Sequence, residues 1–142
     1  DNKDSLLVTK EIFISDLQNN LKELKKFELE LKTIKYFLPP FEWYNENISS
    51  WTKSLGLQLI NYTSNTFTNA DYTTPDLKNY RSSDDIITNL IIKHKTDPNK
   101  LNGCILLIHV GTDNNRIDKF YIHLDELIDE LKNNGYKFKR LE

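Results

Sequence analysis

The feature that most constrains the fold is one short apolar run, Cys104-Ile105-Leu106-Leu107-Ile108. The pair Asn102-Gly103, which is typical of turns, comes directly before it. A run this short and this apolar is typical of a strand buried on both faces, as in a parallel sheet. His109 stands where the run ends, and functional groups of parallel α/β folds gather at the carboxyl ends of strands. His109 is therefore a candidate catalytic group, although a histidine that ends a strand and bonds to a loop fits the position equally well.

The remaining hydrophobic pattern alternates between strand and helix signals. A helix is expected from the cap Thr9 to about Leu31. Two further helices are expected after the caps Asn45 and Ser83, and another over residues 118–133. Further strands are expected at 34–38, 57–62 and 136–141, and Gly56 and Gly135 fit the left-handed ends of two helices. This alternation predicts an α/β fold with a parallel sheet and β-α repeats. With so few strands, and polar segments after their carboxyl ends, the pattern is that of half a β/α barrel.

Composition excludes several classes of protein. The chain has 142 residues, enough for one domain with a real core. Its net charge is only -2, with both signs mixed, which argues against a nucleic-acid partner or a membrane surface held by bulk electrostatics. No apolar run is long enough for a transmembrane helix.

Two segments after predicted strands carry unusual groups. Pro39-Pro40 ends one strand, because proline donates no ladder hydrogen bond, and the aromatic, acid-bearing segment 41–44 follows directly. The second segment, 63–81, is long, polar and without periodicity. Loops of this length in compact domains are usually functional or disordered, and the aromatic residues of this one favour an ordered loop that covers something.

These segments resemble parts of the polysaccharide deacetylases, carbohydrate esterase family four. The stretch Pro39-Pro40-Phe41-Glu42-Trp43-Tyr44-Asn45, with the following helix, is similar to the third motif region of that family. The stretch from Gly103 to His109, with the following helix and Gly135-Tyr136-Lys137-Phe138, is similar to its closing Leu-x-His motif and last strand. Asp71-Tyr72 is similar to the fourth motif. The resemblance covers the chain from about Val8 to Leu141.

The resemblance implies a distorted β/α (TIM-like) barrel that removes N- or O-acetyl groups from extracytoplasmic sugar polymers. The family holds a divalent metal, usually zinc, with an Asp-Asp pair and a His-x-x-x-His motif that precede its third motif. Neither precedes the segment 39–45 in this chain, whose three histidines lack that spacing, and Leu38 stands where many members have an arginine. Residues 1–142 are therefore expected to be the C-terminal part of such a domain, with the metal ligands upstream.

The resemblance also implies roles for individual residues. His109 would be the general acid that protonates the leaving amine or alkoxide, since an unperturbed imidazole has a pKa of about 6.5. Asp71 would hold it in one tautomer, as carboxylates do elsewhere. Leu107, on the same side of the strand, would help form the pocket for the acetyl methyl group, with a plain core role as the alternative. The substrate groove would be lined by Pro40, Phe41, Glu42, Trp43 and Tyr44.

Two other functions remain open at this point. One is a non-catalytic carbohydrate-binding module that keeps the aromatic segment. The other is a β/α-barrel glycosidase that uses the carboxylates of Glu42 and Asp71. In either case half a barrel would expose apolar surface and unpaired strand edges, so we expect the chain to associate with its missing half or with itself, or to be poorly stable alone.

Overall fold

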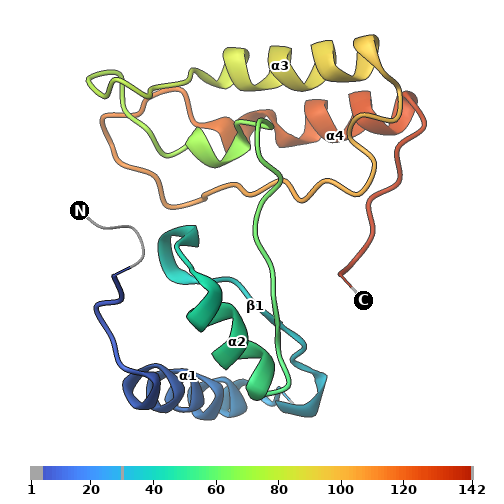
Figure 1. Ribbon diagram of the computed structural model, residues 1–142. Helices are drawn as coiled ribbons and strands as arrows, with labels where there is room; N and C mark the ends of the chain where they lie inside the picture. The colour runs from blue at the N-terminus through green and yellow to red at the C-terminus, as the bar shows by residue number, and fades with distance from the viewer. Residues whose placement is uncertain (1–4, 30, 142) are drawn as a thin grey trace. The chain divides into compact units, whose positions relative to one another are not determined.

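The computed structural model describes residues 5–29 and 31–141 as two compact units, which meet in the sequence between Asn61 and Tyr62 (Figure 1). Each unit is described here by itself. No helix in these two described stretches combines the length and the apolar character needed to cross a bilayer.

The first unit opens with the helix α1 (Lys10–Leu24). The side chain of Thr9 caps it, as predicted, by accepting a hydrogen bond from the N–H of Ile12 at 3.3 Å. The helix is shorter than predicted: a 3₁₀ turn (Lys25–Phe27) follows, and Glu28 then takes a left-handed conformation with φ 59°. Phe27 continues the helical apolar spacing but is 75% exposed, so a further turn of the helix would bury no apolar face there. A second 3₁₀ turn covers Leu31–Thr33.

A β-α-β arrangement completes this unit. Strands β1 (Tyr36–Phe37) and β2 (Gln58–Leu59) pair in parallel, with Tyr36 opposite Gln58. Between them lies helix α2 (Glu46–Ser54), capped by Asn45 as predicted. Gly56, with φ 77°, follows at the predicted left-handed position. The parallel sheet and the α/β class are confirmed on this small scale.

Aromatic rings and aliphatic residues pack the first unit together. The ring of Phe13 lies 5.7 Å from that of Phe37 and 5.8 Å from that of Trp51, measured between centroids. Leu17, Ile48 and Leu57 are buried. The core therefore joins α1 to the β-α-β arrangement.

The second unit is built on two helices, α3 (Ser83–Thr96) and α4 (Leu124–Asn133), which lie side by side in Figure 1. The cap of α3 is Ser82 rather than the predicted Ser83, because Ser82 and Asp85 form a reciprocal capping box. A 3₁₀ turn (Phe120–His123) replaces the predicted first turn of α4, and Gly135 ends that helix with φ 90°, as predicted. The core cluster consists of Ile86, Leu90, Leu101, Phe120, Leu127 and Leu131.

The predicted strands at 103–109 and 136–141 are wrong as strands: both segments are extended but form no ladder. The first pairs only once, where the N–H of Thr63 donates to Ile105 O at 2.9 Å and the N–H of Ile105 donates to Thr63 Oγ1 at 2.9 Å. Pairing stops there because Thr63 begins a turn closed by the N–H of Thr66 at 3.4 Å.

Burial along this segment also differs from the prediction. Cys104, Leu106 and Ile108 pack against the helical core, and all residues from 104 to 109 are half-buried. Alternate residues of an extended chain point to opposite sides. The segment is therefore covered on one side by the helices and is not a strand buried on both faces.

Candidate functional site

The second unit brings the predicted pair Asp71 and His109 into direct contact. The N–H at Nδ1 of His109 donates to Asp71 Oδ1 at 2.6 Å, and the backbone N–H of His109 donates to Asp71 Oδ2 at 2.6 Å. Because a carboxylate only accepts, this contact fixes the proton on Nδ1 whether the imidazole is neutral or charged. Both oxygens of Asp71 are thus used to orient one histidine.

The loop that carries Asp71 is ordered by buried threonines. A short 3₁₀ turn (Thr68–Ala70) ends at Asp71, whose side chain is fully buried. Thr66, Thr68 and Thr73 are also buried, and the hydroxyl of Thr73 donates to Ala70 O at 2.6 Å. The prediction of an ordered loop over 63–81 is confirmed, and its role is to hold a carboxylate.

His109 keeps one nitrogen available for chemistry. Its side chain is 34% exposed, and no group in the described part of the chain bonds to Nε2. The ring of Tyr72 meets it edge-on with the centroids 5.2 Å apart, while the Tyr72 side chain remains 47% exposed. An imidazole held at Nδ1 by a carboxylate and open at Nε2 can give or take a proton there.

A buried arginine, Arg116, organises the same loop. Arg116 is fully buried, and NH1 donates to Thr73 O at 2.7 Å and to Arg81 O at 2.9 Å. Nε donates to Asp118 O at 3.1 Å, and NH2 donates to Ser83 Oγ at 3.3 Å and lies 3.6 Å from Asp118 Oδ2. The guanidinium thus donates four hydrogen bonds, which tie both ends of the loop's second half, at Thr73 and Arg81, to Ser83 at the start of α3. No pattern in the sequence marks this arginine as buried.

Asp118 and Tyr80 complete this network. Burial acts to raise the pKa of Asp118, but the N–H of Ser83, the charge of Arg116 and the hydroxyl of Tyr80 together hold that pKa below its usual value. Burial raises the pKa of Tyr80, and its hydrogen bond to the Asp118 carboxylate raises it further. The network is therefore built around an ionised Asp118 and a neutral Tyr80.

A lysine fixes the backbone just after His109. Nζ of Lys119 donates to the carbonyl and hydroxyl oxygens of Thr112, both at 3.1 Å, and to Asp113 O at 2.5 Å. An ammonium has three donors, and all three are used here. The segment that follows the candidate catalytic residue is thereby held from two directions, by Asp71 and by Lys119.

In the first unit, the predicted substrate loop is exposed and strained. The side chains of Phe41, Trp43 and Tyr44 are 83%, 82% and 52% exposed, Pro40 is exposed, and Glu42 is half-buried. Phe41 and Glu42 have φ of 56° and 58°, a left-handed conformation that costs a non-glycine residue about 1–3 kcal/mol. Asn61 holds the strained backbone by donating from Nδ2 to Glu42 O at 3.0 Å. The strained segment leaves three aromatic rings exposed to solvent, and rings that only packed in a core would not need this conformation.

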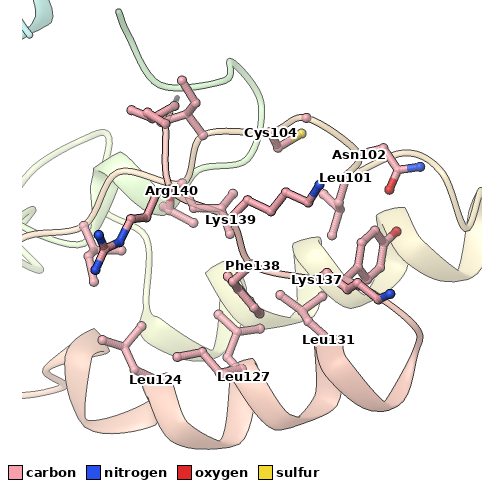
Figure 2. A pocket seen from close by; sticks show the side chains of 18 of the residues that line it. Leu101, Asn102, Cys104, Leu124, Leu127, Leu131, Lys137, Phe138, Lys139 and Arg140 are labelled. Atoms are coloured by element: carbon pink, nitrogen blue, oxygen red, sulfur yellow. The ribbon is translucent and has the colours of Figure 1, made fainter. Parts of the chain in front are cut away.

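The second unit also contains an apolar pocket of about 810 Å³ (Figure 2). Figure 2 shows Leu124, Leu127 and Leu131 of α4 on one side and Phe138 and Arg140 of the final segment on another. Neither His109 nor Asp71 lines it. Leu107 is half-buried and does not line this pocket, whereas its neighbours Leu106 and Ile108 do.

The predicted site residues are divided between the two units. Asp71 and His109 lie in the second unit, and residues 40–44 lie in the first. Both oxygens of Asp71 are engaged by His109, which leaves no free carboxylate for the glycosidase chemistry considered with Glu42. Among residues 5–29 and 31–141, no group of three or more His, Cys, Asp or Glu side chains could hold a metal ion.

Comparison with known proteins returns no family model, curated protein or solved structure that matches the chain.

Proposed function

We propose that the chain is the C-terminal part of a deacetylase domain that removes acetyl groups from a carbohydrate polymer, with His109 as its general acid. The observation that carries the proposal is the His109–Asp71 pair, with its 2.6 Å contact at Nδ1 and its open Nε2. The resemblance of three segments to the motifs of polysaccharide deacetylases supports the choice of reaction. In this proposal the second unit belongs to a β/α barrel that acts on extracytoplasmic glycans.

The chemistry assigned to the pair is one proton transfer. Hydrolysis of an acetamide or acetyl ester passes through a tetrahedral intermediate, whose C–N or C–O bond breaks only when the leaving nitrogen or oxygen is protonated. His109 delivers that proton from Nε2 and becomes neutral, with its remaining proton on Nδ1. The buried Asp71 carboxylate keeps the ring oriented and stabilises the charged imidazolium before the transfer.

The metal of such enzymes has no binding site among the residues described here. The proposal therefore assigns zinc or another divalent ion to ligands outside this sequence and derives no step from it. Leu107, next to His109 on the same side of its segment, is proposed to contact the acetyl methyl group.

The test is acetate release from an N- or O-acetylated glycan by a polypeptide that contains this sequence together with the metal-binding motifs. His109→Ala should lower kcat by a factor of about 10²–10⁴, the usual contribution of a positioned general acid. His94→Ala is the matched control, because His94 lies on α3 and bonds to Tyr136 rather than to the pair. If His109→Ala leaves kcat unchanged, His109 is not the general acid.

A second candidate function is non-catalytic carbohydrate binding. The strained, exposed aromatic segment 41–44 favours it, since such rings can stack on sugars without any catalytic group. Glycan binding without acetate release, and without any effect of His109→Ala, would support this function over the deacetylase.

A further inference from the structure

A second pocket lies in the first unit, between the aromatic segment 41–44 and α2. It measures about 530 Å³ and is lined by Tyr44, Asn45, Glu46, Ser49, Ser50 and Lys53. Glu46, Ser49, Ser50 and Lys53 stand at positions i, i+3, i+4 and i+7 of α2, so they lie on one face of the helix. The opposite face is buried through Ile48 and Thr52. The pocket is therefore a polar helix face with an aromatic residue at its end.

The hydroxyl groups on this face differ from those elsewhere on the same helix. Thr52 donates to Ile48 O and Ser54 donates to Trp51 O, each at 2.7 Å, so both hydroxyls are occupied by the helix backbone. Ser49 and Ser50 have no such bond to any described residue. Their hydroxyls are available to a ligand as donors and as acceptors.

The charged groups on this face are equally uncommitted. Glu46 and Lys53 form no ion pair within residues 5–29 and 31–141. They stand seven residues apart, which is two turns of the helix. One carboxylate and one ammonium leave the pocket without net charge, which favours a neutral ligand with many hydroxyl groups over a phosphate or a cation.

Tyr44 supplies the flat surface that such a ligand needs. Tyr44 is 52% exposed and stands two residues after Glu42, whose backbone, like that of Phe41, is held in the left-handed conformation. An exposed aromatic face beside free hydroxyls and charged groups is the combination that binds a pyranose, whose C–H face is apolar and whose edge carries hydroxyls.

We propose that this pocket is a glycan subsite that binds one neutral sugar residue. In this proposal the sugar ring stacks on Tyr44, and the sugar hydroxyl groups form hydrogen bonds with Ser49 and Ser50. At the edge of the sugar, Glu46 accepts hydrogen bonds and Lys53 donates them. The inference rests on the proposed function only for the choice of N-acetylated glycan, because the pocket itself lies wholly within the first unit.

The experiment is a titration of the ¹⁵N-labelled 142-residue chain with N-acetylchitohexaose, followed by NMR. Amide shifts should concentrate in residues 44–53. Tyr44→Ala should weaken binding about tenfold, whereas Tyr44→Phe, which keeps the ring, should retain most of it. Lys53→Ala should weaken binding, and Lys95→Ala, an exposed lysine near the end of α3, is its matched control.

Each outcome decides between the two proposals. Absence of binding, shifts confined to other segments, or wild-type affinity in Tyr44→Ala would overturn the subsite. The deacetylase proposal is tested separately, because His109→Ala should leave N-acetylchitohexaose binding at residues 44–53 unchanged. Binding here without any acetate release by the larger polypeptide would keep the subsite and reject the deacetylase.

Discussion

Replacing Arg116 with methionine tests how the second unit holds its candidate site. Methionine keeps a long unbranched side chain but removes all five N–H donors. The carbonyl groups of Thr73 and Arg81 then lose their donors at 2.7 and 2.9 Å, and Asp118 loses its ion pair. The contact at the Thr73 carbonyl is buried and the contact at the Arg81 carbonyl is partly buried, so loss of the donor costs about 1–3 kcal/mol at the first and less at the second. The Asp118 side chain is 30% exposed, so water replaces part of its lost ion pair, and the total loss is about 3 kcal/mol.

A loss of this size is large compared with the total stability of a domain, about 5–15 kcal/mol. Both tryptophans lie in the first unit, so their fluorescence does not report on the second. Amide hydrogen exchange resolves the two units. A loss of about 3 kcal/mol should speed exchange in the core of α3 by a factor of about 100, because each 1.4 kcal/mol is tenfold, and should leave α2 unchanged.

Two further variants sharpen this result. Arg116→Lys keeps the charge but has three donors instead of five, so its exchange rates should fall between those of the wild type and Arg116→Met. Arg140→Met is the control, since Arg140 is exposed in the final segment. If Arg116→Met exchanges within a factor of about five of the wild type (about 1 kcal/mol), the network is not a net source of stability and the reasoning fails.

Four other changes have defined outcomes. Asp71→Asn puts an amide beside two donors of His109, so kcat for acetate release should fall by a factor of about 10²–10⁴ with little change in KM, and an unchanged kcat would contradict the orienting role. The pKa of Asp118 is lower in the folded state than its ordinary 3.8. The contribution of its ionised form to the free energy of unfolding is therefore complete above about pH 4 and is lost as the pH falls through the folded-state pKa. Acid titration followed by circular dichroism should show a weaker acid destabilisation in Asp118→Asn than in the wild type. Phe41→Gly should raise the free energy of unfolding of the first unit, measured by urea titration with tryptophan fluorescence, by about 0.5–1 kcal/mol, because it relieves a left-handed residue that is 83% exposed; a lower free energy of unfolding would count against strain. Leu107→Lys should reduce self-association in sedimentation experiments, since a charge on an unpaired extended segment blocks edge pairing, and an unchanged sedimentation profile would exclude this edge as the contact.

The sequence predicted helix ends well because they depend on local chemistry. The cap residues Thr9 and Asn45 and the left-handed Gly56 and Gly135 follow from side-chain oxygens and from the absence of a Cβ atom. The displaced cap at Ser82 shows the limit of this reasoning. Two serines stand in succession, and the reciprocal bond with Asp85 selects the first.

Strands depend on partners, which a hydrophobic run does not specify. The run from Cys104 to Ile108 correctly indicated an extended, half-apolar segment. It could not indicate that pairing would stop at Thr63, because that depends on a turn in another part of the chain. The same reasoning applies to Arg116, whose burial depends on carbonyl groups from the distant residues Thr73 and Arg81.

The contact between Asp71 and His109 depends on a chain of bonds that begins at Arg116. Arg116 fixes the carbonyl of Thr73, the hydroxyl of Thr73 fixes Ala70 O, and Ala70 directly precedes Asp71. The N–H of Arg81 donates to the same hydroxyl of Thr73 at 3.3 Å, so the loop is joined to itself across eight residues. A carboxylate that must meet two donors of one histidine at 2.6 Å tolerates little movement of its backbone. Loosening the loop at Arg116 should therefore reduce proton transfer at His109 without removing any group that touches the imidazole.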